Sequence, residues 1–456
     1  MDKKITIAIV AVAVVVIAVA ACFAAGVFDN NKKSGPGSLG GNTIDEDHFP
    51  DSDSRLWVYG NANEDDKIDS SDLTYIQNII DKTKTATTLA DANADGRVDA
   101  DDIAYAQSII DEDEIDVYYI DNYFKVAEVS WPVNSIAIGY CSGAYLADLA
   151  GVCDKVDMID ETITSYWTEI NSNFSKAASF GSTGSPDYEA MMNNKIDVYV
   201  VGYCDANADV ISPGKLNPAG IDVMFITTCD NDGVDYPNEY IDRSTFMFGF
   251  LLQGDMDKMY DYLEWHDDVL DTLIKAGETI ADDDKAAFMM ARSSPFYSTS
   301  TISITGKDNT NNIHAEWVGV DAVGQHSSYL PSNYNKLTAE QILTVILESA
   351  NDNVIYYMDN EHDGLRHQYN LDDCIAADKK MLESSDVEIH YLGMAREAGN
   401  SPLYVIELTF YQNVMYPGLT DLDYTELFDY YFSHFTSEDY SSLIDIDDYF
   451  KDYGTA

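Results

Sequence analysis

The sequence predicts an α/β protein with two lobes joined by one long α-helix, preceded by a small all-α domain and an N-terminal transmembrane helix. Two observations support this fold class. Beyond residue 116, short apolar stretches such as SIAIGYC, KIDVYVVGYC and GIDVMFITTC are each followed by helix-like sequence, which is typical of parallel α/β layers. The segment 255–280 lacks proline and spaces its apolar residues at helical intervals, which predicts the joining helix.

Changes of composition along the chain predict its domain boundaries. The stretch between the apolar N-terminus and residue 55 is rich in Gly, Ser, Asn and Asp, which is typical of a flexible linker. We expect a membrane anchor or signal segment at 1–28, this linker at 29–55, a paired-loop module at 56–114, a first ligand-binding lobe at 122–254, a connecting helix at 255–280 and a second lobe with closing helices at 281–456.

The N-terminus predicts the compartment. An uncharged run from Ile5 to Phe28 is long enough to span the hydrocarbon core of a membrane. Lys3 and Lys4 before it favour a cytoplasmic N-terminus. The residues ending at Cys22 also resemble a lipobox, so lipid attachment at Cys22 is an open alternative. In either case we expect the body on the cell surface, extracytoplasmic and anchored to the cytoplasmic membrane by its N-terminus.

Charge and cysteine content limit the possible partners. With 26 Lys plus Arg against 80 Asp plus Glu, the net charge of −54 excludes nucleic acid as a natural partner and favours cations. Outside Cys22 the chain has five cysteines, an odd number that argues against a fully paired disulfide framework. Cys141, Cys204 and Cys229 each follow a predicted strand, where a soft metal site, a disulfide with a free thiol, or ordinary buried cysteines are all open.

Two acidic loops repeat with an offset of thirty residues, beginning at Asn61 and Asp91. Each loop offers side-chain oxygens at positions 1, 3, 5, 9 and 12 and a backbone carbonyl at position 7, a spacing that suits the six to eight hard oxygens preferred by calcium. We therefore predict two calcium ions. The predicted ligands are Asn61, Asn63, Asp65, Lys67, Asp69 and Asp72 in the first loop, and Asp91, Asn93, Asp95, Arg97, Asp99 and Asp102 in the second.

The two loops differ at position 6, where a glycine favours the sharp turn. Gly96 occupies this position in the second loop and Asp66 in the first, so we expect the first site to be strained or weaker. Each loop is followed by a matching helical stretch, LTYIQNII or IAYAQSII. This tandem pattern over residues 56–114 resembles a dockerin. The resemblance implies a cohesin-like partner, with Ser70, Ser71, Ala100 and Asp101 at the positions that set cohesin choice. A calcium clip without a partner is the alternative.

The body has a second resemblance, which covers nearly all of residues 124–436. Segments such as SPDYEAMMNNKIDVYVVG and LTAEQILTVILESANDNVIYYM, together with the long helix between the lobes, are similar to ABC-importer solute-binding proteins for iron-siderophore, haem or cobalamin. The resemblance implies two Rossmann-like lobes, an ABC importer permease as partner, and an iron chelate, haem or corrinoid as ligand. It also implies that Glu189 and Glu340 contact arginines of the permease.

Ligand contacts are expected where the parallel strands end, because open α/β sheets bind ligands at their carboxyl edges. The candidates at predicted strand ends or in the following loops are Tyr140, Ser142, Tyr203, Arg292, His326, Arg366 and Arg396. The arginines would grip an anionic chelate. The sequence contains no nucleophile elbow, HExxH helix or phosphate loop, so we predict no enzyme and no catalytic residues. The alternatives are a dockerin-bearing cell-surface enzyme and a structural adhesin of an extracellular complex.

Overall fold

The computed structural model describes residues 44, 48–51, 54–161, 163, 165–201, 212–226, 240–292, 301–351, 354–362 and 371–455. The predicted anchor at 1–28 and most of the predicted linker lie outside these residues. Among the helices that are described, none is both long and apolar enough to cross a membrane. The chain divides into two compact units, the first made of residues 1–136, 192–200 and 206–226 and the second of 137–191, 201–205 and 227–456.

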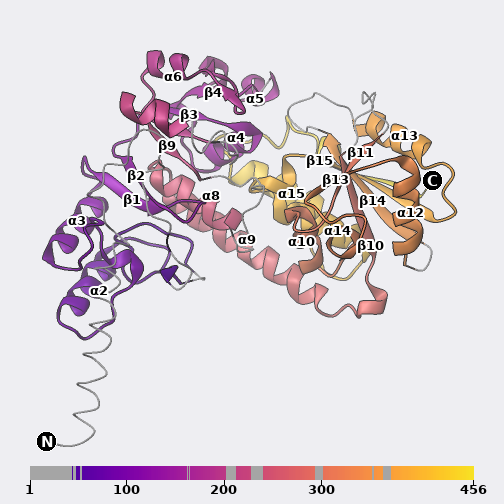
Figure 1. The fold of residues 1–456 in the computed structure, drawn as a ribbon, viewed down its shortest axis with the longest axis horizontal. Helices are drawn as coiled ribbons and strands as arrows, with labels where there is room; N and C mark the ends of the chain where they lie inside the picture. Colours follow the sequence, from indigo (N-terminus) through magenta and orange to yellow (C-terminus); the bar gives the residue numbers. More distant parts are fainter. Residues whose placement is uncertain are drawn as a thin grey trace, which may run out of the picture. The chain divides into compact units, whose positions relative to one another are not determined.

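The first unit contains the paired-loop module, a β-hairpin and two strands of the first lobe (Figure 1). Its elements are α2 (Ser70–Ile80), the short 3-10 helix η2 (Thr88–Ala90), α3 (Ala100–Ile110), β1 (Asp116–Ile120), β2 (Val126–Ser130), β8 (Val198–Val200) and β9 (Asp222–Met224). β1 and β2 are antiparallel, with Asp116 opposite Ser130. β8 and β9 are parallel, as predicted for this lobe. The hairpin is tied to β9, since the Asn122 amide donates to the Phe225 carbonyl at 3.0 Å.

The module packs α2 and α3 around a core of small residues, in which Ala62, Ile76, Ala90, Ala92 and Ala106 are buried. Its predicted all-α character is not confirmed. The residues before the first loop run antiparallel to β1: Val58 forms a β-bridge with Tyr119, and the Ile120 amide donates to the Trp57 carbonyl at 2.9 Å. The module is therefore joined to the hairpin by backbone hydrogen bonds.

The second unit begins with the rest of the first lobe. Its elements there are β3 (Ile136–Ile138), α4 (Tyr140–Leu149), β4 (Val156–Ile159), α5 (Ser165–Ile170), β5 (Ala178–Ser179), β6 (Gly181–Ser182), β7 (Ser185–Pro186) and α6 (Tyr188–Asn194). The strands run in the order β5-β4-β3, and β4 pairs with β5 in parallel. The run SIAIGYC thus splits into a three-residue strand and the start of α4, so that Tyr140 lies at the first turn of a helix.

The predicted joining helix is present. α8 (Tyr240–Leu251) is followed by α9 (Met256–Gly277), a helix of 22 residues. The Asp255 side chain caps α9 by accepting the Lys258 amide at 3.1 Å, which satisfies one free N–H of the first turn. Met259, Leu263, Val269 and Leu273 are buried along one stripe, as their helical spacing predicted.

The second lobe is built on a mixed sheet in the order β13-β11-β10-β14-β15-β16, with β12 also paired to β10. The strands are β10 (Ala287–Arg292), β11 (Ile302–Thr305), β12 (Asp321–Ala322), β13 (Tyr334–Leu337), β14 (Val354–His362), β15 (Glu388–Ala395) and β16 (Phe450–Thr455). β10, β12, β14 and β15 are parallel to one another, whereas β11 is antiparallel to both β10 and β13, and β16 is antiparallel to β15. A purely parallel arrangement is therefore wrong for this lobe. The stretch EWVGVDA is largely not a strand, since α10 continues to Trp317.

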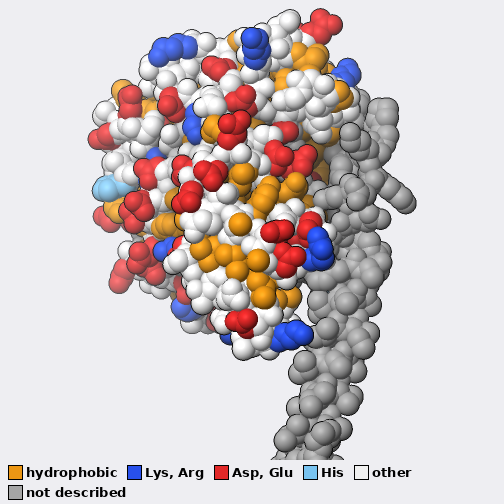
Figure 2. All heavy atoms as spheres, turned by 90° about the vertical axis from the view of Figure 1, so that its left-hand side faces the viewer, with side chains coloured by type: hydrophobic (Ala, Val, Ile, Leu, Met, Phe, Trp, Pro, Cys, Tyr) orange, Lys and Arg blue, Asp and Glu red, His pale blue; other side chains and the backbone are white. Residues whose placement is uncertain are grey.

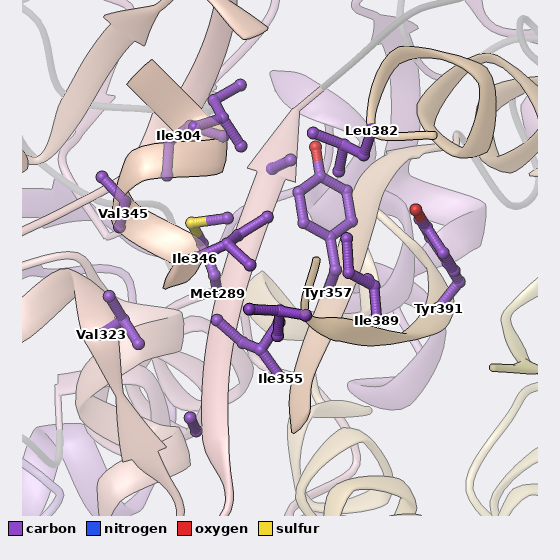
Figure 3. Packing of buried hydrophobic residues seen from close by; sticks show 14 of the residues in the cluster. Met289, Ile304, Val323, Val345, Ile346, Ile355, Tyr357, Leu382, Ile389 and Tyr391 are labelled. Carbon is purple, nitrogen blue, oxygen red and sulfur yellow. The ribbon is translucent and has the colours of Figure 1, made fainter. Parts of the chain in front are cut away.

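Helices cover both faces of this sheet. They are α10 (Thr310–Trp317), α11 (Val323–His326), α12 (Ala339–Ser349), α13 (Leu371–Met381), α14 (Tyr404–Met415) and α15 (Tyr424–His434). On β10, Met289 packs into the core shared with Ile346 of α12 and Ile355 of β14 (Figure 3). The preceding residue, Phe288, faces the opposite side of the sheet, where the centre of its ring lies 5.0 Å from the centre of the Tyr411 ring of α14. The alternation of side chains along a strand buries β10 on both faces, which explains its continuous apolar run.

Candidate functional site

The two acidic loops have the same hydrogen-bond pattern thirty residues apart. In each, the carboxylate at position 12 closes the loop by accepting the amide N–H groups of positions 3 and 9. Asp72 accepts from Asn63 at 3.1 Å and Asp69 at 2.9 Å, and Asp102 accepts from Asn93 at 3.3 Å and Asp99 at 2.7 Å. The position 9 side chains also cap the following helices, where Asp69 accepts the Ser71 amide and Asp99 the Asp101 amide. The sequence repeat is thus a structural repeat.

Position 1 differs between the loops. In the second loop the Asp91 carboxylate accepts the amides of Asp95 at 3.1 Å and Gly96 at 2.8 Å. In the first loop Asn61 is fully buried, and its amide nitrogen donates to the Leu56 carbonyl at 2.7 Å and to the Asp65 carbonyl. The Asn61 side-chain oxygen has no hydrogen-bond partner among the described residues. The side chain at position 1 therefore offers a buried oxygen in each loop, a carboxylate oxygen of Asp91 or the amide oxygen of Asn61.

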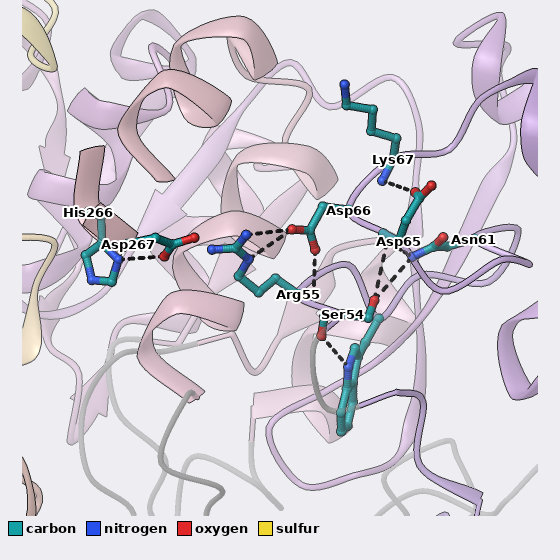
Figure 4. A network of polar contacts seen from close by, with 9 residues as sticks. Ser54, Arg55, Asn61, Asp65, Asp66, Lys67, His266 and Asp267 are labelled. Atoms are coloured by element: carbon teal, nitrogen blue, oxygen red, sulfur yellow. Dashed lines mark hydrogen bonds and ion pairs between the residues drawn. The ribbon is translucent and has the colours of Figure 1, made fainter. Parts of the chain in front are cut away.

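Position 6 differs as well, and the difference is compensated. Gly96 has a φ of 91°, a conformation that favours glycine, whereas Asp66 is not among the described residues with positive φ. The Asp66 carboxylate instead accepts hydrogen bonds from Arg55, at 2.7 Å from its amide, 3.0 Å from Nε and 2.8 Å from Nη2 (Figure 4). The backbone strain expected at position 6 of the first loop is therefore not found, because Asp66 does not adopt the positive φ of Gly96. Its hydrogen bonds with Arg55 stabilise this other conformation.

The donors present in both loops suit a hard cation. Burial, helped by the charge of neighbouring carboxylates and opposed by hydrogen bonds from backbone N–H groups, raises the pKa of Asp91 to about 7 and that of Asp72 to about 6. Such carboxylates repel one another unless a cation lies among them. Together with the buried oxygen of Asn61, they fit calcium chemistry. Among the described residues, no three His, Cys, Asp or Glu side chains converge on a single metal position, so the amide and carbonyl oxygens are needed to complete a calcium set.

The surface of the module that could meet a partner includes the starts of α2 and α3. Ser70, Ser71, Ala100 and Asp101 are all exposed there. On the face drawn in Figure 2, acidic side chains are spread widely, basic ones are few, and apolar patches lie between them.

In the body, the structure brings together two of the seven predicted ligand-binding residues. Arg396 follows the last residue of β15, and its guanidinium carbon lies 5.8 Å from the centre of the Tyr140 ring, at the first turn of α4. Ser142 is two residues further along α4 and is buried. The structure thus brings Tyr140 and Arg396 together.

The other predicted residues are spread out or lie elsewhere. Arg292 ends β10, and its guanidinium carbon lies 5.2 Å from the centre of the Tyr334 ring. His326 ends α11, where its Nε2 is 2.8 Å from a carboxylate oxygen of Asp321. Tyr203 and Arg366 lie outside the described residues, as do Cys204 and Cys229, whereas Cys141 is described and buried. Glu189 and Glu340 are exposed in the first turns of α6 and α12, where a partner could reach them.

Sequence reasoning missed the polar groups buried behind Arg396. The residue after it, Glu397, is 1% exposed and lies 3.3 Å from the hydroxyl of Tyr145, which is also hydrogen-bonded to Tyr449. A second group joins Asp242 of α8, His266 of α9 and Tyr404 of α14: the tyrosine hydroxyl donates to the Asp242 carboxylate at 3.0 Å, and His266 Nε2 lies 3.3 Å from it. The one available signal was a histidine within the apolar stripe of a long amphipathic helix.

Comparison with known proteins identifies the class of each part. Residues 59–107 match the family model of the dockerin type I domain, so this part of the chain is a type I dockerin domain. No curated protein matches the chain. A TroA-like periplasmic binding protein, FepB, from Veillonella parvula is 12% identical with a TM-score of 0.52, over 71% of this chain and 97% of its own. The body thus has the fold of a TroA-like periplasmic binding protein.

Two further solved structures share this fold. A periplasmic solute binding protein from Veillonella parvula DSM 2008 is 14% identical with a TM-score of 0.51, over 72% of this chain and 97% of its own. The CeuE protein of Helicobacter pylori, solved with Ni(II) bound, is 14% identical with a TM-score of 0.50, over 74% of this chain and 98% of its own. The two predicted resemblances, to a dockerin and to this class of binding protein, are confirmed at the level of domain and fold.

Proposed function

We propose that the chain is an extracytoplasmic solute-binding protein that captures an iron chelate, haem or a corrinoid for an ABC importer and is not an enzyme. The observation that carries the proposal is the position of two arginines at one edge of the second-lobe sheet. Arg292 ends β10 and Arg396 follows β15, and both strands pair in parallel with β14 between them. Strands two apart are separated by about 10 Å, which suits two guanidinium groups on one anionic ligand.

The surroundings of Arg396 support an aromatic or conjugated ligand. Its guanidinium lies near the Tyr140 ring, where cation–π attraction would hold the side chain in place before the ligand arrives. A ring of this kind can also stack on a planar chelate. The solved structures that share this fold include two periplasmic binding proteins and a protein with Ni(II) bound, which supports a binding function for the body of this chain.

Ligand binding can be tested on the full chain by thermal shift with a ferric siderophore, haemin and cyanocobalamin. We expect one of them to raise the melting temperature and to be recovered unchanged by mass spectrometry. Arg396→Gln is expected to weaken its binding by roughly 10- to 100-fold, the effect of losing one charge-assisted hydrogen bond. Lys275→Gln, at an exposed site on α9, is the control and should bind normally. Turnover of a polysaccharide would favour the dockerin-bearing enzyme instead.

The two exposed glutamates are proposed as the permease contacts. A carboxylate on each lobe facing arginines would steer association and fix the orientation of docking. Glu189→Lys and Glu340→Lys should each lower importer-dependent uptake while leaving ligand affinity in solution unchanged. Normal uptake by the double variant would reject this assignment.

Residues 1–28 are proposed to anchor the protein to the cytoplasmic membrane as an uncleaved segment. Detection of a mature N-terminus at a lipidated Cys22 would instead support lipid attachment at Cys22.

The dockerin domain is proposed to bind two calcium ions and to dock on a cohesin-like module. The predicted ligand residues of both loops would hold calcium, which would supply the positive charge that their buried carboxylates lack. Calorimetric titration of the calcium-depleted full chain should show two bound ions, and Asp72→Asn and Asp102→Asn should each remove one. A full chain that takes up no calcium would contradict the proposal. The protein would then be a nutrient-binding protein held in a surface assembly.

A further inference from the structure

The dockerin domain has two repeat-related helices, and the chain itself covers one flank of α3. This helix lies beside the β-hairpin, where the Tyr105 hydroxyl donates to the Asp116 carbonyl at 2.7 Å (Figure 1). The centre of the Tyr105 ring is 6.2 Å from that of Tyr118 on β1. Further along α3, Ile109 is 2% exposed and lies against Gly60, in the segment that pairs with β1. The hairpin and this segment therefore occupy the space beside α3.

The equivalent positions on α2, thirty residues earlier, are more open. Tyr75 corresponds to Tyr105, but its hydroxyl has no hydrogen-bond partner among the described residues. The Tyr75 ring is met instead by Lys84, whose Nζ lies 5.4 Å from the ring centre. Ile79 corresponds to the buried Ile109 and is only half-buried. The two helices are thus equivalent in sequence but differ in accessibility.

This difference matters because a protein partner covers more than one helix face. A stable interface buries about 800 Å² on each side, whereas a helix with its side chains is only about 10 Å wide. A partner on the outer face of α3 would reach the flank where Tyr105 is bonded to the hairpin. A partner on α2 can extend over Tyr75 instead.

The charges that follow the two helices are opposite in sign. Lys82 and Lys84 come directly after α2, and the repeat-related positions after α3 hold Glu112 and Glu114. All four side chains are exposed. In a chain with a net charge of −54, the more open helix therefore ends in a local positive charge. Complementarity favours a partner with carboxylates opposite these lysines.

The outer face of α2 is polar and uncharged. Ser70, Ser71, Thr74 and Gln77 are exposed at spacings of three and four residues, which places them on one face of the helix. Depletion of charge is typical of the centre of a protein interface. On α3 the position equivalent to Ser71 holds the exposed Asp101. Accessibility and charge thus both distinguish α2 from α3.

We infer that a cohesin-like module docks on α2 alone, with carboxylates of the module opposite Lys82 and Lys84 and polar groups opposite the exposed serines. The inference rests on the proposed docking of such a module by the dockerin domain. α3 then serves as the contact of the domain with the hairpin. The repeat has one face for the partner and one for its own chain.

Two arginine variants at repeat-related exposed positions test the inference in the calcium-saturated full chain. Surface plasmon resonance against a panel of recombinant cohesin modules first identifies a module that binds the unaltered chain. Thr74→Arg, on the outer face of α2, should weaken its binding about 100-fold, because the interface would have to bury a long charged side chain. Ala104→Arg, at the same position of α3, is the matched control and should bind within twofold. Arginine favours helices, so both variants should fold, as circular dichroism would verify.

Charge reversal after each helix gives an independent measurement. Lys82→Glu should weaken binding of the same module about 5-fold at low salt and less at high salt, because exposed charge pairs are screened. Glu112→Lys is its control and should bind within twofold. The two residues share a left-handed backbone conformation, with φ of 61° and 54°, so each exchange introduces a side chain that the repeat already carries there.

The outcomes separate the inference from the proposed docking. Equal losses in Thr74→Arg and Ala104→Arg would overturn the inference, as would a loss in the double variant only, because two interchangeable faces would then compensate each other. Normal binding by the double variant, or by Lys82→Glu at low salt, would also overturn it. If no cohesin module binds the unaltered chain, the proposed docking fails and the inference fails with it.

Discussion

Replacing Asp66 with glycine should destabilise the first calcium loop, although glycine occupies the same position in the second loop. Gly96 has a φ of 91°, whereas Asp66 is not among the described residues with positive φ and does not need the freedom of glycine. What the first loop needs at this position is the carboxylate, which holds the segment before the loop through Arg55. A substitution that restores the loop consensus is thus expected to weaken the structure.

The size of the effect follows from the contacts. Arg55 donates three hydrogen bonds to Asp66, at 2.7, 3.0 and 2.8 Å, and the two side chains are 23% and 20% exposed. For a charge-assisted pair partly screened by solvent, their loss costs about 1 to 2 kcal/mol. The added backbone entropy of glycine costs about 0.5 to 1 kcal/mol more. The sum, about 2 kcal/mol, corresponds to roughly a 30-fold change in the equilibrium constant for local opening of the first loop.

Hydrogen exchange of the Arg55 amide measures this opening locally, because that amide donates to Asp66. In the calcium-loaded full chain, Asp66→Gly should speed its exchange roughly 30-fold, and Asp66→Ala somewhat less. Gly96→Ala is the reciprocal control: it should strain the second loop by about 1 kcal/mol or more and leave the Arg55 amide unaffected. Exchange of that amide at an unchanged or slower rate in Asp66→Gly would refute the reasoning.

Three further predictions concern the second unit. Burial raises the pKa of Glu407 to about 7 from 4.5, so the folded protein keeps a proton that the unfolded chain releases, and stability should fall as pH rises through this window. Glu407→Gln should flatten the dependence of melting temperature on pH between 5 and 8, and an unaltered profile would contradict this. Ile346→Ala, in the core, should lower the free energy of unfolding by about 2 to 4 kcal/mol, measured by denaturant titration. Leu347→Ala is the control, because Leu347 is 65% exposed, and it should lower the free energy of unfolding by less than about 0.5 kcal/mol. Equal losses in the two variants would contradict this prediction. Gly277→Ala should lower the melting temperature, because its Cβ would lie 2.5 Å from the backbone of Val318, whereas Gly214→Ala meets nothing within 4 Å and should not.

The parts of the fold that the sequence predicted are those with a local periodic signal. α2 and α3 could be placed from the thirty-residue repeat, and α9 from the spacing of Met259, Leu263 and Leu273. The antiparallel strands β11, β13 and β16 were not predicted, because their pairing depends on distant partners and their sequences are short or polar. The mixed sheet therefore follows from tertiary contacts.

The candidate sites show the same limit. The shared hydrogen-bond pattern of the two acidic loops was predictable because loop positions 1 to 12 are close in sequence and repeat. The contact of Tyr140 with Arg396 joins residues that are far apart in the chain, and the strand-end rule had placed Tyr140 at the edge of the first lobe and Arg396 at the edge of the second. The buried group of Asp242, His266 and Tyr404 had only a weak sequence signal, the place of His266 in the apolar stripe of α9, since an acidic residue or a histidine on a helix is usually exposed.

The attachment of the dockerin domain also depends on pairing that no local pattern reveals, and it has a mechanical consequence. Trp57 and Val58 pair with β1, and Arg55 just before them holds Asp66 in the first calcium loop. β1 in turn pairs with β2, and Asn122 in the turn between them donates to the Phe225 carbonyl just beyond β9. A continuous path of hydrogen bonds thus leads from the first calcium loop to a strand of the proposed solute-binding body. The dockerin domain is therefore attached to the hairpin by backbone hydrogen bonds as well as by the chain itself.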